Sequence, residues 1–151
     1  MFAKKLSDKN SKEAKLYITS RLEAWETSFG EQHSLEKVQD HLEKVIESTK
    51  EAILMIWDDS SNLLGFVEHV LPVSTTNKAK LRFIYILPEF RNKGLTKQII
   101  KLLVDFIPKQ VEIIYLQVSI TNKHAIAVYK HLGWKKIKTD QKRLEMEYIC
   151  D

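Results

Sequence analysis

The stretch IYILPEFRNKGLT, residues 84–96, passes from an apolar strand through a glycine loop into an amphipathic helix. Leu81–Leu87 is expected to be apolar on both faces, as in a central strand that is covered by helices. Pro88 cannot donate a hydrogen bond to a strand ladder, so the strand is expected to end there. The helix is predicted from Leu95 to Ile107, and its buried face is expected to carry Ile99, Leu102, Leu103 and Phe106.

This junction is also suited to binding an anion. A helix N-terminus leaves about four backbone N–H groups unpaired and carries a partial positive charge. Gly94 lets those N–H groups approach an anion closely, because no Cβ intervenes. Arg91 and Lys93 add side-chain charge suited to phosphate. The junction therefore predicts a phosphate site, and the alternative is a helix start that binds nothing.

The hydrophobic periodicity of the rest of the chain predicts a mixed α+β fold. Helices are predicted at 11–29, 35–46, 95–107 and 122–132, and strands at 52–57, 63–71, 81–87, 112–119, 134–138 and 143–149, with room for a short strand before the first helix. The strand-helix-strand unit from 81 to 119 is expected to make its two strands parallel. We therefore predict a mixed, mostly antiparallel central sheet with helices on both faces. A ligand is expected where the parallel pair separates.

Composition narrows the class of protein. The 151 residues show no repeat or linker and are read as a single domain, 1–151. No apolar run is long enough to span a bilayer, and the N-terminal residues lack the apolar segment of a signal peptide. The single cysteine, Cys150, excludes an internal disulfide and a multi-cysteine zinc site, so a cytoplasmic location is expected. The net charge of +4 comes from scattered lysines, which favours a solvated surface over nucleic-acid binding.

A second motif follows the last buried strand, in the stretch NKHAIAVYKHLGW, residues 122–134. Asn122 and Tyr129 are seven residues apart, which is two helical turns, so they are expected on the same side of the short helix. Ala125 and Ala127 leave room for a ligand to pass close to it. The alternatives are a helix N-cap for Asn122 and a core position for Tyr129. Gly133 is expected to end the helix.

These two motifs, in this order and at this separation, resemble the GNAT superfamily of acetyl-CoA-dependent N-acetyltransferases. The match covers residues 81–136, and the order of the flanking elements also resembles that fold. The resemblance implies that the backbone of Ile84, Tyr85 and Ile86 pairs with the pantetheine arm and polarises the acetyl carbonyl. It implies that a loop wraps the pyrophosphate, formed by Arg91, Asn92, Lys93, Gly94, Leu95, Thr96 and Lys97.

The resemblance also assigns roles in the second motif. The asparagine that matches Asn122 hydrogen-bonds the pantetheine in the family, and the tyrosine that matches Tyr129 is the usual general acid for the departing thiolate. One departure lies in the loop, which normally ends in glycine or alanine where this chain has Thr96. The threonine side chain either crowds the phosphate or donates to it, and the backbone donors remain.

The general base is the weakest part of the resemblance. Relatives often carry an acidic residue at the positions of Arg82 or Phe83, and some place a glutamate at the position of Gln117. The remaining candidates are Glu68 and His69, which are neighbours on one strand and are expected to point to opposite faces. The alternative for Glu68 is a solvated sheet face, and a water chain is the alternative to a dedicated base.

The sequence therefore predicts acetyl transfer from acetyl-CoA, as cosubstrate and without a metal, to a primary amine of a small molecule or peptide. Direct attack in a ternary complex is expected. The alternative is a catalytically silent coenzyme A-binding sensor or scaffold with the same fold. The family shapes its acceptor side with the first two helices and their connection, here Trp25, Phe29 and the turn at 30–33. An exposed terminal strand leaves a homodimer open.

Overall fold

The computed structural model describes residues 1–29, 34–72 and 76–150, apart from the side chains of residues 25–29. The turn at 30–33 and the side chains of Trp25 and Phe29, which were expected on the acceptor side, therefore lie outside the described residues. None of the described helices is long and apolar enough to cross a membrane.

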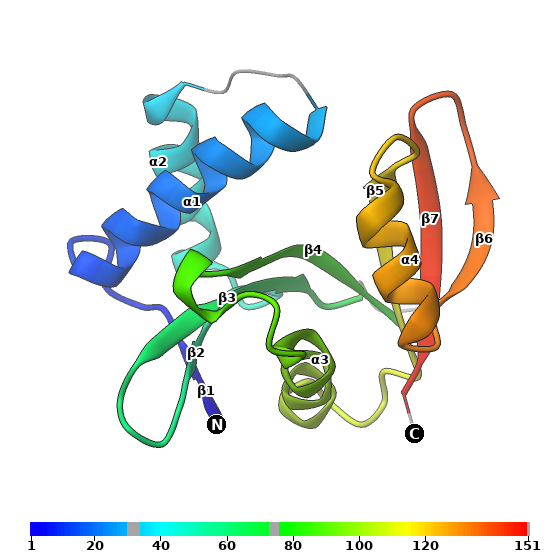
Figure 1. The fold of residues 1–151 in the computed structure, drawn as a ribbon. Helices are drawn as coiled ribbons and strands as arrows, with labels where there is room; N and C mark the ends of the chain where they lie inside the picture. The colour runs from blue at the N-terminus through cyan, green and yellow to red at the C-terminus, as the bar shows by residue number, and fades with distance from the viewer. Residues whose placement is uncertain (30–33, 73–75, 151) are drawn as a thin grey trace.

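A seven-stranded sheet runs through the described chain in the order β1-β2-β3-β4-β5-β7-β6 (Figure 1). Neighbouring strands are antiparallel except β4 and β5, which are parallel, as predicted. The predicted short strand before the first helix is present as β1. The strands are β1 (Phe2–Lys5), β2 (Glu51–Trp57), β3 (Leu63–Val70), β4 (Lys78–Ile86), β5 (Ile113–Ser119), β6 (Lys135–Thr139) and β7 (Arg143–Ile149).

Helices cover both faces of this sheet, which confirms the predicted fold class. The helices are α1 (Lys12–Phe29), α2 (Leu35–Glu47), α3 (Leu95–Phe106) and α4 (Lys123–His131). Tyr17 of α1 and Leu42 of α2 belong to one buried apolar cluster, whereas Leu103 of α3 and Ile126 of α4 belong to another. Alternate strand residues enter each cluster, so α1 and α2 lie on one face and α3 and α4 on the other (Figure 1).

The local signals at the helix ends work as expected. The Ser34 side chain accepts from the backbone N–H of Lys37 at 3.2 Å and caps α2. Gly133, with φ of 98°, follows the end of α4. The expected burial of Phe106 is wrong, because this last residue of α3 has 45% of its surface exposed.

The strand β4 begins three residues earlier than predicted. Lys78 and Lys80 lie outside the strand predicted at 81–87, but they pair with Ile113 and Tyr115 of β5. The parallel ladder consists of this short segment, so β4 and β5 part beyond it. The expectation that the strand is apolar on both faces is also wrong, because Arg82 lies within it, half-buried and ion-paired.

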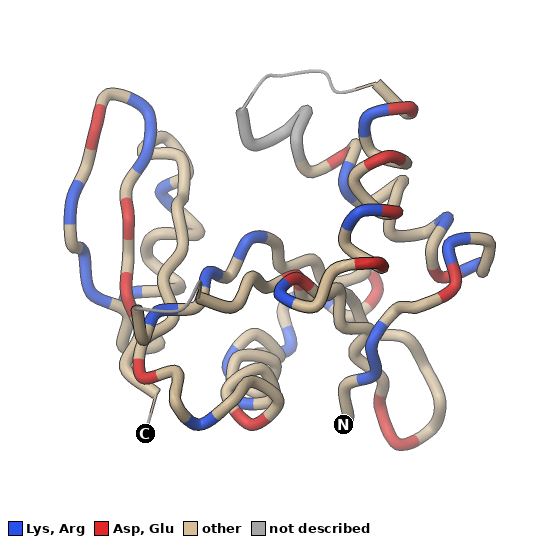
Figure 2. Tube along the Cα trace, turned by 180° about the vertical axis from the view of Figure 1, so that it is seen from behind, with Lys and Arg blue, Asp and Glu red and all other residues tan. Residues whose placement is uncertain are grey.

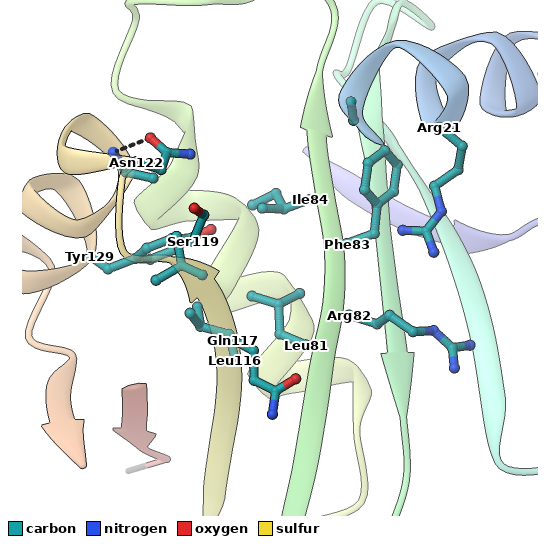
Figure 3. A pocket seen from close by; sticks show the side chains of 13 residues that line it. Arg21, Leu81, Arg82, Phe83, Ile84, Leu116, Gln117, Ser119, Asn122 and Tyr129 are labelled. Atoms are coloured by element: carbon teal, nitrogen blue, oxygen red, sulfur yellow. Dashed lines mark hydrogen bonds between the residues drawn. The ribbon is translucent and has the colours of Figure 1, made fainter. Parts of the chain in front are cut away.

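A β-bulge bends β4 next to the point of divergence. Glu68 of β3 pairs with Phe83, whereas the next residue, His69, pairs with Leu81, so Arg82 is an extra residue without a partner in the ladder. As a result Arg82 and Phe83 both turn toward the face of the sheet that α1 covers (Figure 3). Bulges next to active sites commonly re-aim side chains in this way.

Charged residues are spread over the whole molecule. Figure 2 shows Lys and Arg interspersed with Asp and Glu along helices, strands and loops. The edge strand β6 has all five residues exposed, including Ile137. A homodimer through this edge stays a prediction.

Candidate active site

A pocket lies where β4 and β5 part (Figure 3). The parallel ladder ends at Lys80 and Tyr115, so the backbone N–H and C=O groups of alternate β4 residues beyond it face the gap, while those of the others face β3. The pocket is lined by residues of α1, β4, β5 and α4, which are Arg21, Ala24, Leu81, Arg82, Phe83, Ile84, Leu116, Gln117, Val118, Ser119, Asn122, Ala125 and Tyr129.

The loop from β4 into α3 has the backbone shape that the glycine predicted. Gly94 is the N-cap of α3 with φ of 69°, in the left-handed region that favours glycine. A Cβ built on Gly94 meets no described atom within 4 Å, apart from its chain neighbours and the adjoining helix backbone. Residues 91–94 are exposed, and Leu95 and Thr96 begin the helix half-buried. The first N–H groups of α3 therefore open toward solvent at the end of β4.

The two cationic side chains of this loop turn back on the protein. The Nε of Arg91 donates to the carbonyl of Ile86 at 2.8 Å, and its guanidinium carbon lies 5.0 Å from the centre of the Tyr85 ring. The ammonium of Lys93 lies 5.6 Å from the centre of the Phe90 ring. Arg91 thus ties the loop to the end of β4, in addition to placing positive charge beside the helix N-terminus.

Asn122 and Tyr129 line the same pocket, as their spacing predicted. The Oδ1 of Asn122 accepts from the N–H of Ala125 at 3.2 Å, so the N-cap reading is confirmed (Figure 3). This bond leaves the amide N–H₂ of Asn122 as a donor. The Tyr129 ring packs edge-on against Trp134 with the ring centres 5.4 Å apart. Burial raises the pKa of Tyr129 to about 12, so its hydroxyl is protonated at neutral pH.

Glu68 lies in the core between β3 and the first two helices. The expected alternative of a solvated face is wrong, because its side chain has 0% of its surface exposed. Tyr17 and the Nε of Arg82 donate to its carboxylate, and the Nε2 of His41 lies 2.9 Å from Oε2. A guanidinium nitrogen of Arg21 lies 4.0 Å from the same oxygen.

These contacts fix the charge of Glu68. Burial by itself would raise the pKa of this carboxyl. The hydrogen bond from His41 and the charges of Arg21 and Arg82 outweigh burial and lower the pKa to about 2. A carboxylate held in this way is a weak proton acceptor at neutral pH.

His69 and Gln117 complete the set of sequence candidates. His69 points to the opposite face from Glu68, as predicted, and its ring centre lies 6.1 Å from that of Phe106 on α3. Burial lowers the pKa of His69 to about 4, and it does not line the pocket described above. Gln117 does line that pocket, and no carboxylate does so among the described residues.

Sequence reasoning missed Tyr17, Arg21 and His41. Tyr17 and Arg21 are four residues apart and follow the same face of α1 as buried Ala14, so a signal was present. A polar pair on the buried face of a helix predicts a buried partner of opposite charge. Only the packing of α1 on β3 identifies that partner as Glu68.

The described residues form no cluster of three or more His, Cys, Asp or Glu side chains that is placed to hold a metal ion. The functional elements at this pocket are instead an open strand edge and a protonated tyrosine, and a helix N-terminus behind a glycine follows the same strand along the chain. This combination suits a ligand with a phosphate end and an amide-bearing arm.

Comparison with family models identifies the protein family to which this chain belongs. Residues 18–134 match the model described as Acetyltransferase (GNAT) family. This span is well over half of the chain, and the chain belongs to that family. It is an acetyl-CoA-dependent N-acetyltransferase, with acetyl-CoA as its cosubstrate. No curated protein matches the sequence.

Solved structures agree on the fold at low sequence identity. A Vibrio cholerae spermidine N-acetyltransferase in complex with CoA and spermine has a TM-score of 0.77 and 19% identity, over 98% of this chain and 95% of that chain. A chimera of the Vibrio cholerae enzyme with hSSAT has a TM-score of 0.75 and 22% identity, over 99% and 96%. A dodecameric form of the Vibrio enzyme has a TM-score of 0.69 and 21% identity, over 97% and 92%.

Proposed function

We propose that this enzyme transfers the acetyl group to a primary amine of a small molecule or peptide by direct attack in a ternary complex. The observation that carries the proposal is that one pocket contains the open edge of β4, Asn122 and Tyr129, while the N-terminus of α3 follows β4 along the chain. Side chains of α1 line the other end of the same pocket. Acetyl-CoA and the acceptor amine would therefore bind next to each other in one pocket, which direct attack requires.

The donor end of this proposal rests on backbone groups. The N–H groups from Arg91 to Lys97 would hold the pyrophosphate, and the open space around Gly94 suits the close approach of a phosphate oxygen. Thr96 lies in the first turn of α3, where its own backbone N–H adds to these donors. The β4 segment Ile84–Ile86 would hydrogen-bond the pantetheine arm and the acetyl oxygen. The free N–H₂ of Asn122 would donate to the same arm.

Tyr129 is assigned as the general acid. Its hydroxyl is protonated across the physiological range, because burial raises its pKa to about 12. A protonated phenol in the pocket can donate to the thiolate that leaves when the amine attacks. Asn122 caps the N-terminus of α4, the helix that carries Tyr129, and this cap fixes where the helix begins.

Glu68 as general base stays a prediction from the sequence, and its contacts support a different role. Its carboxylate is engaged by Tyr17, His41 and Arg82, and it is held in its ionised form. We therefore assign Glu68 to positioning Arg82 and the β4 bulge. The acceptor amine would lose its proton to water in the pocket before it attacks.

The test is release of free thiol from acetyl-CoA on addition of amines, together with calorimetric titration of acetyl-CoA into the protein. The proposal expects binding, an increase in melting temperature through linkage, and thiol release that depends on an amine. Binding without thiol release for any primary amine would support the silent coenzyme A-binding module instead. Absence of acetyl-CoA binding would refute both.

A further inference from the structure

Positive charge is concentrated at one end of the sheet. Residues 121–144, which include α4, β6 and the turn into β7, contain seven of the 24 lysines and arginines but one of the 20 acidic residues, Asp140. The rest of the chain therefore carries slightly more negative than positive charge. The whole-chain count, which favours a solvated surface, averages these two unlike parts. Strand β6 is the outermost strand beside β7, and Figure 2 shows lysines and no acidic residue along it.

The exposed face of α4 carries no carboxylate. Its exposed residues are Lys123, His124, Ala127, Lys130 and His131. Lys123 and Lys130 are seven residues apart, which is two helical turns, so they lie on the same side of the helix. Ala125 and Tyr129, which line the pocket described above, lie on the other side. The exposed face of α4 therefore looks away from the proposed acetyl-CoA site.

Lys136 of β6 extends this exposed face of α4. Its cross-strand partner is Met146 of β7, which is buried in the same apolar cluster as α3 and α4, so Lys136 projects from the face of the sheet that α4 covers. The Lys136 ammonium lies beside that of Lys130, and the hydrogen bond and the charge of Lys130 lower the pKa of Lys136. Two cations from separate elements thus meet at the surface, where an anion between them would relieve their repulsion. We call Lys123, Lys130 and Lys136, with His124 and His131, the α4–β6 surface.

The three lysines of the α4–β6 surface are available to a ligand. All three are exposed, and none forms an ion pair with a carboxylate in the part of the chain that the structure describes. The carboxylate of Asp140 accepts two backbone N–H groups of its own turn, each at 2.8 Å. The next acidic residues, Glu145 and Glu147 of β7, flank Met146 and therefore project from the opposite face of the sheet.

The composition of the α4–β6 surface indicates which anion it fits. The centre of a protein–protein interface is poor in lysine and rich in aromatic residues, and a helix that binds a membrane surface adds large apolar side chains to its lysines. Ile137 is the one large apolar residue of α4 and β6 that is exposed. Exposed lysines without apolar neighbours suit the phosphate groups of a nucleic acid, whose backbone is bound by cations whatever its sequence.

We propose that the α4–β6 surface binds the phosphate backbone of a nucleic acid. This inference goes beyond the proposed acetyl transfer and does not depend on it. Because the surface and the pocket lie on different sides of α4, nucleic acid and acetyl-CoA bind at the same time. Binding is measured without an acceptor amine, so an enzyme that releases no thiol from any amine still tests the surface.

The experiment follows the fluorescence anisotropy of a labelled single-stranded RNA and of a labelled DNA duplex, between about 50 and 200 mM salt. Wild type is compared with the double variant Lys130→Gln/Lys136→Gln. The variant should bind more weakly at every salt concentration. The slope of log K against log salt concentration should become shallower by about 1.4 for the single strand and about 1.8 for the duplex, which corresponds to two lost phosphate contacts.

Lys12→Gln/Lys15→Gln is the matched control, because it removes two exposed lysines from α1, away from the α4–β6 surface. It should keep the wild-type slope. Acetyl-CoA affinity and melting temperature check the fold of each variant. If the Lys130→Gln/Lys136→Gln protein does not fold, Lys123→Gln replaces it, and the slope should then change by half as much.

Several results would overturn the inference. The first is that wild type binds neither nucleic acid at low salt, and the second is that both double variants lose the same affinity. A third is displacement of the nucleic acid by saturating acetyl-CoA, because the lysines would then serve the cosubstrate. The fourth is equally tight binding of polyglutamate or of phosphatidylserine vesicles, which would assign the surface to an acidic protein or a membrane. A preference for RNA or for the duplex supports the inference and identifies the kind of nucleic acid.

Discussion

Replacing Glu68 with glutamine removes a negative charge that Tyr17, His41 and Arg82 hold in the core. Glu68→Gln keeps the size of the side chain but leaves Arg82 and Arg21 beside a neutral group. The pKa of Glu68 falls from 4.5 to about 2 in the folded protein. At about 1.4 kcal/mol for each pKa unit, this corresponds to about 3 kcal/mol of stabilisation.

The sign of the pH dependence follows from the lowered pKa. A carboxyl whose pKa is lower in the folded state stabilises the protein above its unfolded pKa, and the stabilisation is lost as pH falls through the folded pKa. Wild type should therefore lose about 3 kcal/mol from this group between pH 4.5 and pH 2. Glu68→Gln should be less stable by about that amount at neutral pH, and the difference should close toward pH 2.

Urea unfolding followed by tryptophan fluorescence, at neutral pH and at several acidic pH values, measures both quantities. Glu43→Gln is the control, because Glu43 forms an exposed ion pair with Lys9 at 2.9 Å, and such pairs contribute about 1 kcal/mol at most. Equal stability of wild type and Glu68→Gln at neutral pH would refute the positioning role. A separate measurement is the pH–rate profile. If its acidic limb is present in wild type and absent in Glu68→Gln, Glu68 is the general base.

The remaining predictions concern the proposed acetyl-CoA site. Tyr129→Phe should lower kcat by roughly 10²-fold in thiol-release assays while leaving calorimetric acetyl-CoA affinity nearly unchanged, and an unchanged kcat would remove its acid role. Because burial raises the pKa of Tyr129 to about 12, the wild-type rate should show no alkaline decline centred on the ordinary tyrosine value of 10.0. Gly94→Ala and Gly133→Ala both place a side chain at positive φ without a described clash, so each should cost about 1 kcal/mol of stability. Only Gly94→Ala should weaken acetyl-CoA binding by calorimetry, and equal affinities of the two variants would contradict a phosphate site at Gly94.

Much of the fold follows from local signals that the sequence carries openly. Pro88 and Gly94 mark the end of a strand and the start of a helix, and the structure has both at those positions. The periodicity of residues 35–46 and the cap at Ser34 predict α2 to within one residue. These predictions succeed because the hydrogen bonds and backbone conformations involved lie within a few residues of each other.

The start of β4 was not predicted, because it depends on residues that are distant in the sequence. Lys78 and Lys80 have low strand propensity and no apolar pattern, and they are strand residues because β5 lies beside them. The bulge at Arg82 also has no local signal, since it depends on how β3 and β4 register. Both features decide where the parallel ladder ends and hence where the pocket opens.

The sequence by itself predicted the proposed acetyl-CoA site: the strand, the glycine loop and the helix with Asn122 and Tyr129, whose spacings are short-range and specific. Only the tertiary structure decided which side chains of α1 and β4 line the pocket. Arg21 and Arg82 are 61 residues apart in the chain. In the sequence Glu68 resembles any glutamate of a strand, and it is buried only because α1 and α2 cover it in the fold. The physical reason is that the charge of a buried group depends on what surrounds it, and for Glu68 those surroundings come from three other elements, α1, α2 and β4.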